Sequence, residues 1–398
     1  MRDRLMFSRL CLILFCLSLG SVAKADWRDQ IKTMVSHGGV LAVSEKGTPL
    51  FMLNIDQKFM PASTLKVATS LLALKELGEN FRFPTELYLD SQNILYIKGY
   101  GDPFLISEEL AQMAAAIAAK GVKTINGIIL DTSFYDKNIE ISGRSQTLNP
   151  YDAQPAALAA NFNTIYVYKN SKGEVSSAEI QTPMTELTKI LAKNAPVGKS
   201  RISLVNHPEE AVLYVGYLLK EFLLENKIQV SGSIRTGLVA PQAKLILSYK
   251  NSRTLKEILK NALEYSQNLV MNQVFLMVGV KKKGPPATIA KGKEAVTQFL
   301  KTEVGLQDFS VEEGSGLSRQ NKLSPAQMDR ILVAFFPYRK ILPAKDNILY
   351  KTGTLNGVAA LVGYFQSATH GWVRFSILLN QGANYREKIV KVLYDNLQ

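Results

Sequence analysis

The sequence predicts an α+β fold in which a five-stranded antiparallel sheet, flanked by helices, is built from both ends of the chain. Two strand-like segments joined by a turn lie near the N-terminus, and three more precede the last helix. The long middle segment has its own alternation of strands and helices. Because both ends contribute to one sheet, the middle is free to form a large inserted α+β domain. The predicted division is 26–80 plus 245–398 for the discontinuous domain and 81–244 for the insertion.

The first 25 residues have the pattern of an export signal. Three arginines precede a short apolar run at 10–19, and Ala23-Lys24-Ala25 is a cleavage site of the small-x-small type. The apolar run is too short to predict a membrane span. Cleavage before Asp26 is therefore predicted, and a retained N-terminal tether is the alternative.

In the discontinuous domain, turn and capping residues mark where the elements begin and end. Pro61 can open a helix that stops at Gly78, Thr254 can cap a helix, and Ser324 precedes a proline that starts another. The predicted helices are 27–35, 67–77, 255–264, 269–279, 289–304, 325–335 and 386–397. The predicted strands are 40–44, 49–53, 349–354, 357–366 and 372–380.

In the middle segment, apolar strands alternate with two convincing helices. Ser107 is expected to cap the first of these helices, which ends at Gly121. The predicted helices are 108–119 and 209–227, and the predicted strands are 84–89, 94–98, 125–130, 164–169 and 230–237.

Several kinds of chemistry are excluded by composition. Both cysteines, Cys11 and Cys16, lie inside the export signal, so a thiol nucleophile, a disulfide framework and a thiolate metal site are not expected in the mature chain. The histidines His37, His207 and His370 have neither the spacing of metal ligands nor the context of a Ser-His-Asp enzyme. We predict no metal and no cofactor.

The chain is strongly basic. Its net charge is +13, and removal of the export signal, with four basic residues and one acidic residue, lowers this to +10. Such a charge favours contact with a cell-wall polymer, an anionic membrane surface or nucleic acid. Export makes nucleic acid the least expected partner, and we predict none. A peripheral contact with an anionic membrane or wall surface stays open, beside a basic surface that has no specific partner.

A Ser-x-x-Lys pair, Ser63 and Lys66, is the first candidate for nucleophilic chemistry. Residues three apart lie on one face of a helix, which brings the amine of Lys66 within reach of the hydroxyl of Ser63. Serine is a weak nucleophile until a base takes its proton. A lysine in a dry pocket can have its pKa lowered enough to act as that base. Alone, this pair occurs by chance in most chains of this length.

Two further motifs follow in a fixed order. Ser266-Gln267-Asn268 lies in a helical region, and Lys351-Thr352-Gly353-Thr354 lies on a predicted strand. Each motif is weak by itself, but the three in this order are typical of serine β-lactamases and penicillin-binding proteins. The absence of a histidine in a catalytic context also favours a serine–lysine mechanism.

Five of these residues have predicted catalytic roles. Ser63 would attack a carbonyl with Lys66 as the general base, and Ser266 would bridge the two amines and relay a proton to the leaving group. Asn268 would offer its amide to the substrate backbone and pack against Lys66. Lys351 would add positive potential opposite Ser266.

The other residues of the third motif are predicted to bind substrate. Gly353 would let a substrate strand approach closely, because it has no side chain. Thr352 and Thr354 would hold a terminal carboxylate through their hydroxyls. The backbone N–H groups of Ser63 and Thr354 are the natural donors to an oxyanion.

With these motifs, the chain resembles the D-alanyl-D-alanine carboxypeptidase/endopeptidases of peptidase family S13, the class C low-molecular-mass penicillin-binding proteins. The resemblance implies a penicillin-binding-protein/serine β-lactamase-like transpeptidase domain and a periplasmic enzyme. It implies removal of the terminal D-alanine from peptidoglycan pentapeptides, cleavage of crosslinks, and covalent inhibition by β-lactam antibiotics. It also rests on Gly101-Asp102-Pro103, Asp131-Thr132-Ser133-Phe134, Asn161-Phe162-Asn163, Gly314-Ser315-Gly316-Leu317-Ser318-Arg319 and Leu355-Asn356-Gly357.

Two other functions fit parts of the sequence. A β-lactamase or esterase of the same fold needs a dedicated deacylating group, commonly a tyrosine in place of Ser266 or a separate glutamate, and Ser266 argues for slow deacylation of β-lactams. A non-catalytic cell-wall-binding protein would use the basic surface, but it has no need for the five residues with catalytic roles.

Overall fold

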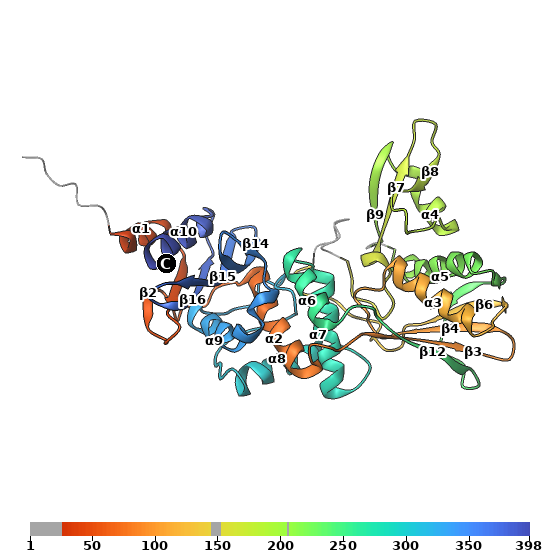
Figure 1. Cartoon of the computed structure of the whole chain (residues 1–398), viewed down its shortest axis with the longest axis horizontal. Coiled ribbons are helices and arrows are strands. Elements are labelled where there is room, and N and C mark those ends of the chain that lie inside the picture. The colour runs from red at the N-terminus through yellow and green to blue at the C-terminus, as the bar shows by residue number, and fades with distance from the viewer. Residues whose placement is uncertain (1–25, 145–152, 205–206) are drawn as a thin grey trace, which may run out of the picture.

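The computed structural model describes residues 26–144, 153–204 and 207–398. The predicted export signal therefore lies outside the described residues. Figure 1 shows an elongated molecule with the sheet built from both chain ends at one end and most of the middle segment at the other. Within the described residues, no helix is both long enough and apolar enough to cross a membrane.

The sheet formed by the two chain ends is antiparallel throughout. In spatial order its strands are β13 (Ala344–Lys345), β14 (Ile348–Leu355), β15 (Val358–Ser367), β16 (Gly371–Leu379), β1 (Gly38–Val43) and β2 (Pro49–Leu53). The pairing of β1 with β16 places Gly38 opposite Leu379 and so joins the first part of the chain to the last. The five predicted strands are confirmed. The sixth, β13, was not predicted, because two residues are too few to show an alternating pattern.

Helices cover both faces of this sheet. Successive side chains of a strand point to opposite faces, and in β15 Leu361 joins one apolar core while Val362 joins the other. The core around Leu361 includes side chains of the first and last helices of the chain. The sheet is thus a central layer between α1 (Trp27–Met34) and α10 (Arg386–Leu397) on one side and α2 (Lys66–Leu77) and α9 (Pro325–Phe335) on the other.

A helix at the centre of the molecule, α7 (Asn268–Lys283), is buried on all sides from Asn268 to Gly279. A helix that is apolar all round belongs in an interior, and α7 packs against α2 and α8 (Ile289–Thr302). It follows α6 (Leu255–Glu264) after a short turn. Thr254 caps α6 and forms a capping box with Glu257, which confirms the predicted start of that helix.

The middle segment forms a second, mixed sheet. Figure 1 shows α3 (Ser107–Ala119) and α5 (Pro208–Glu225) on one face of it. The strands in spatial order are β11 (Ile234–Thr236), β6 (Gly127–Asp131), β4 (Ile94–Gly99), β3 (Pro84–Leu89) and β12 (Lys244–Lys250). Smaller sheets join β8 (Val175–Ser177), β7 (Thr164–Lys169) and β9 (Gly198–Ser203), and β5 (Thr124–Ile125) with β10 (Gln229–Val230); α4 (Glu186–Leu191) lies between β8 and β9 in the chain.

Several details of the middle segment differ from the sequence prediction. The single strand predicted at 230–237 is two short strands, β10 and β11, which lie in different sheets. The boundary predicted between residues 244 and 245 falls at the start of β12, which pairs with β3, so the second sheet extends to Lys250. Ser107 does not cap α3, because Ile106 occupies the capping position and Ser107 is the first helical residue. The buried hydroxyl of Ser107 instead lies 2.8 Å from that of Thr182, which ties α3 to the lobe formed by β7, β8 and β9.

Candidate active site

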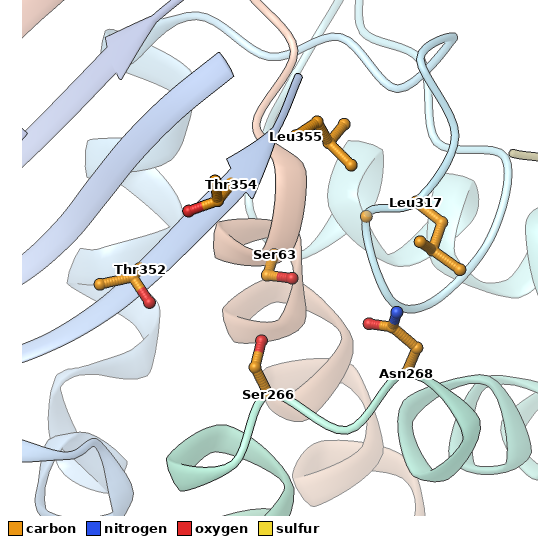
Figure 2. Close-up of a pocket in the computed structure, with 8 residues that line it drawn as sticks. Ser63, Ser266, Asn268, Leu317, Thr352, Thr354 and Leu355 are labelled. Carbon is orange, nitrogen blue, oxygen red and sulfur yellow. The ribbon is translucent and has the colours of Figure 1, made fainter. Parts of the chain in front are cut away.

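A pocket of about 350 Å³ lies where the two chain ends meet the turn between α6 and α7. Figure 2 shows its lining side chains, which come from a turn before α2, from the α6–α7 turn, from strand β14 and from the loop 314–319. All three sequence motifs reach this pocket. The lining residues are Ser63, Ser266, Asn268, Gly316, Leu317, Thr352, Thr354 and Leu355.

Ser63 and Lys66 are in direct contact. The Nζ atom of Lys66 lies 2.8 Å from the Oγ atom of Ser63. One helix running through both residues was predicted, but Ser63 lies in a 3₁₀ turn, Ala62–Leu65, and Lys66 is the first residue of the α-helix. Residues three apart are eclipsed in a 3₁₀ turn, so this tighter geometry holds the hydroxyl directly beside the amine.

The amine of Lys66 is fully buried and makes three hydrogen bonds. Besides contacting Ser63, it donates to the Oδ1 atom of Asn268 at 2.7 Å and to the backbone oxygen of Ser315 at 2.7 Å. Burial lowers the pKa of Lys66 well below its usual value, the positive charge of Lys351 lowers it further, and the carboxylate of Glu313 opposes the shift. The lysine is thereby favoured in the neutral form that can accept a proton.

Asn268 contacts the amine of Lys66 and also lines the pocket. It is the first residue of α7, and its Oδ1 atom accepts the hydrogen bond from Lys66. A side-chain amide has two N–H donors as well as its oxygen, and Figure 2 shows the Asn268 amide at the pocket wall opposite strand β14. The predicted packing of Asn268 against Lys66 agrees with this contact.

Ser266 lies in the turn between α6 and α7 with a left-handed backbone, φ 54°. Its hydroxyl points toward that of Ser63 in Figure 2. Within the described part of the chain, no hydrogen bond joins Ser266 to Lys66 or Lys351. The predicted bridge between the two amines is therefore not formed in this structure.

Lys351 brings a second buried amine to the site from β14. Its Nζ atom donates to the backbone oxygen of Thr352 at 3.0 Å. Burial lowers the pKa of Lys351 to about 8, and the positive charge of Arg386 contributes to the shift, while Glu264 opposes it. At neutral pH the ammonium form prevails, so this end of the pocket carries positive charge.

Two glycines allow the backbone segments around Ser63 to meet. A Cβ atom on Gly353 would lie 2.7 Å from the oxygen of Pro61 and 2.9 Å from the nitrogen of Ser63. A Cβ on Gly316 would lie 1.9 Å from the oxygen of Ala62, and Gly316 also has φ 90°. Gly353 was predicted to make room for substrate. The structure gives it another role, because it lets β14 lie against the turn that carries Ser63.

The loop 314–319 is organised by Glu313, a fully buried carboxylate that the sequence analysis did not select. Its oxygens accept from the backbone N–H of Ser315 at 2.8 Å, that of Gly316 at 2.7 Å and the amide of Asn321 at 2.9 Å. The hydroxyl of Ser315 adds a contact of 2.6 Å. These bonds fix the Ser315 carbonyl that receives Lys66. The sequence signal that could have identified Glu313 is an acidic residue directly before Gly-Ser-Gly.

Arg386 was predicted only as the first residue of the C-terminal helix. The structure places its guanidinium against strand β14, where it donates to the oxygen of Gly353 at 2.8 Å and to the Oγ1 atom of Thr354 at 2.6 Å. None of the three histidines lines the pocket. Among residues 26–144, 153–204 and 207–398, no cluster of three or more His, Cys, Asp or Glu side chains is arranged to hold a metal ion.

A six-stranded antiparallel sheet with a buried Ser-x-x-Lys pair beside the edge of β14, together with the other two motifs, defines a penicillin-recognising serine hydrolase. The chain belongs to the D-Ala-D-Ala carboxypeptidase 3 (S13) family, whose model matches residues 28–203, 191–340 and 336–395. It is therefore a serine-type D-Ala-D-Ala carboxypeptidase.

Known proteins resemble the chain over most of its length. A D-alanyl-D-alanine carboxypeptidase from Actinomadura sp. (strain R39) is 25% identical and aligns with 86% of this chain and 77% of the relative. The crystal structure of penicillin binding protein 4 (dacB) from Haemophilus influenzae matches with a TM-score of 0.76 at 20% identity, covering 93% of this chain and 99% of that one. A predatory peptidoglycan endopeptidase from Bdellovibrio bacteriovorus shares the fold, with a TM-score of 0.52 at 15% identity and 90% coverage of both chains.

Proposed function

We propose that this carboxypeptidase removes the terminal D-alanine from peptidoglycan stem peptides through an acyl-enzyme formed on Ser63. The observation that carries the proposal is the 2.8 Å contact between the buried amine of Lys66 and the hydroxyl of Ser63. Both the Actinomadura and a Haemophilus influenzae relative are named D-alanyl-D-alanine carboxypeptidases, which supports the substrate class.

Acylation would begin when neutral Lys66 takes the proton of Ser63 and the serine oxygen attacks the penultimate D-alanine carbonyl. The backbone N–H groups of Ser63 and Thr354 would stabilise the negative charge that develops on the carbonyl oxygen. Ser266 would relay this proton from Lys66 to the departing amine of D-alanine, giving up its own hydroxyl proton and taking one from Lys66 in exchange. The support for this relay is the direction of the Ser266 hydroxyl, toward Ser63, in Figure 2.

Deacylation would use the same groups. A water molecule replaces D-alanine, and one of its protons passes to the amine of Lys66 as the water oxygen attacks the ester carbonyl. The bond between the acyl carbon and the Ser63 oxygen then breaks, Lys66 returns the proton to that oxygen, and the shortened peptide leaves with a free carboxylate. The amide of Asn268 would hold the acyl group by its backbone.

Before acylation, Lys351, Thr352 and Thr354 would bind the terminal carboxylate of the incoming peptide.

We extend the proposal to crosslinks, β-lactams and location. In a crosslink, the D-alanine carbonyl is bonded to the amine of a second stem peptide, so the same acyl-enzyme permits DD-endopeptidase activity. The fold shared with the Bdellovibrio endopeptidase is compatible with this activity. A Haemophilus influenzae structure of this fold holds a β-lactam, which supports acylation of Ser63 by these drugs. The export pattern at residues 1–25 supports a periplasmic location. The basic net charge supports a peripheral contact with an anionic membrane or wall surface.

The test is product analysis with the mature chain. A peptide ending in D-Ala-D-Ala is expected to lose one D-alanine, and a crosslinked muropeptide dimer is expected to give monomers, with both reactions blocked by benzylpenicillin. Rapid hydrolysis of benzylpenicillin without D-alanine release would identify a β-lactamase instead. A chain that neither cleaves these substrates nor binds the drug would be a non-catalytic wall-binding protein.

The pKa of Lys351 predicts an alkaline limit to activity. Above about pH 8 this amine loses its charge, so kcat/KM for peptides with a free carboxylate is expected to fall. Loss of the Lys351 charge is not expected to unfold the chain, because a folded-state pKa below the unfolded value makes this group's contribution to stability rise between about pH 8 and the ordinary lysine pKa. Replacement Lys351→Arg, which stays charged, should shift the limit upward in a pH profile. An unchanged limit in the variant would assign it to another group.

A further inference from the structure

We propose that Arg386 positions the Thr354 hydroxyl for the free C-terminal carboxylate of the substrate and adds positive charge at that end of the pocket. This inference rests on the proposed function and deepens it, because it states how a peptide with a carboxylate is told from one without. Arg386 is the first residue of α10 and lies thirty-two positions after Thr354 in the chain. Its guanidinium nevertheless contacts the last residue of the third motif.

The guanidinium of Arg386 is largely buried and held on several sides. Its side chain is 12% exposed. One nitrogen, Nη1, donates to the oxygen of Gly353 and to the Oγ1 atom of Thr354, and Nε donates to the carboxylate of Glu387 at 2.7 Å. Planar guanidinium groups with several fixed donors lose little freedom on binding. Arg386 is therefore a preset part of the pocket edge.

The contact with Arg386 determines which way the Thr354 hydroxyl can act. A hydroxyl has one proton to donate and two lone pairs to accept. One lone pair of Thr354 is taken by the guanidinium, and in the described part of the chain no acceptor is found for its proton. Thr354 lines the pocket, and Figure 2 shows its side chain projecting from β14. The proton is thus available to an acceptor in the pocket, such as a carboxylate oxygen.

The charge around this position also favours an anion. Arg386 and Lys351 are close enough for the arginine to depress the pKa of the lysine. No acidic side chain lines the pocket. Glu387, the ion-pair partner of Arg386, is 62% exposed, so solvent screens much of its charge. Arg386 and Lys351 therefore add positive charge beside a pocket wall that has no charged side chain, with Glu264 opposing them, and a ligand carboxylate would be attracted to this end.

A purely structural role for Arg386 makes a different prediction. If the guanidinium only fastened α10 to β14, its loss would affect every substrate alike. If it positions the carboxylate contact, the loss would be confined to substrates that carry the carboxylate. A matched pair of peptides, one ending in D-Ala-D-Ala with a free carboxylate and the other with a C-terminal amide, separates the two.

The experiment uses the mature chain with Arg386→Gln, Arg386→Lys and, as a matched control, Lys388→Gln on the same helix. For Arg386→Gln, KM for the carboxylate peptide is expected to rise about 10- to 100-fold, the usual effect of losing a charged hydrogen bond. Little change is expected in kcat, or in KM for the amide. Arg386→Lys should recover part of the loss, and Lys388→Gln should resemble the unaltered chain, because Lys388 is exposed.

Two results would overturn the inference: an equal loss with both peptides, or no loss with either. Failure of the proposed function looks different, because the unaltered chain would then release neither D-alanine from the carboxylate peptide nor D-alaninamide from the amide peptide. Thermal unfolding of each variant shows whether it is folded and how stable it is. Should Arg386→Gln not fold, the carboxylate-to-amide ratio of KM values in Arg386→Lys decides, since an unchanged ratio would contradict the role.

Discussion

Replacing Lys66 by alanine is expected to slow the acylation of Ser63 by benzylpenicillin by about 10²- to 10⁴-fold, the usual contribution of a general base. The amine lies 2.8 Å from the serine hydroxyl, and burial favours its neutral form. Without it, no other base contacts Ser63 among the described residues. Intact-protein mass, followed over time after addition of the drug, measures the rate of adduct formation.

The controls for this experiment lie in α2 and in the turn before it. Lys75→Ala removes an exposed lysine from α2 and should leave acylation unchanged. Ser63→Ala should give no adduct at any time. Lys66→Met fills the volume that alanine leaves empty, and it separates loss of the base from a packing defect. Acylation at the normal rate in a folded Lys66→Met variant would remove lysine from the base role.

Replacement Gly316→Ala is expected to cost both stability and activity. The new Cβ would lie 1.9 Å from the Ala62 oxygen, so the loop or the turn carrying Ser63 must move. Overpacking of this kind costs roughly 1–3 kcal/mol of the free energy of unfolding. A displacement of about 1 Å at the nucleophile costs roughly 10²-fold in rate. Urea unfolding and the rate of benzylpenicillin adduct formation measure the two effects.

A second glycine provides the control for backbone strain. Gly284 also has a left-handed backbone, φ 75°, but a Cβ there would meet nothing within 4 Å. Gly284→Ala should therefore show only the backbone strain of that conformation, roughly 1–3 kcal/mol, and normal acylation. If Gly316→Ala acylates as fast as Gly284→Ala, the loop does not constrain the position of Ser63.

The strands and helices were predictable where a long periodic pattern signals them. β2 and α10 have the bounds that the sequence predicts, because both have clear patterns and turn residues at their ends. β13 was missed because two residues show no period. β12 was missed although it is longer. Its place at the sheet edge leaves most of its side chains at least partly exposed, so no clear apolar alternation marks it.

The three motifs were predictable because each is a short local pattern in a known order, and the structure brings all of them to one pocket. Two residues of the site were not selected from the sequence. Glu313 lies directly before Gly-Ser-Gly, but the sequence does not show that the N–H groups of the following residues converge on its carboxylate. Arg386 reads as an ordinary helix start until α10 is placed against β14. The 3₁₀ turn at Ser63 was also hidden, because the apolar pattern continues through it.

The pairing of β1 with β16 also limits when the enzyme can become active during its synthesis. A chain interrupted after Lys345 would contain Ser63 and Lys66 but not β14, and so would lack the strand that lies against the nucleophile turn. Domains generally fold as units, and long-range strand pairing is slow. Ser63 is synthesised early and the C-terminal strands are synthesised last, so an unfinished chain has no assembled active site. Activity therefore begins only after the C-terminal strands have been synthesised and paired.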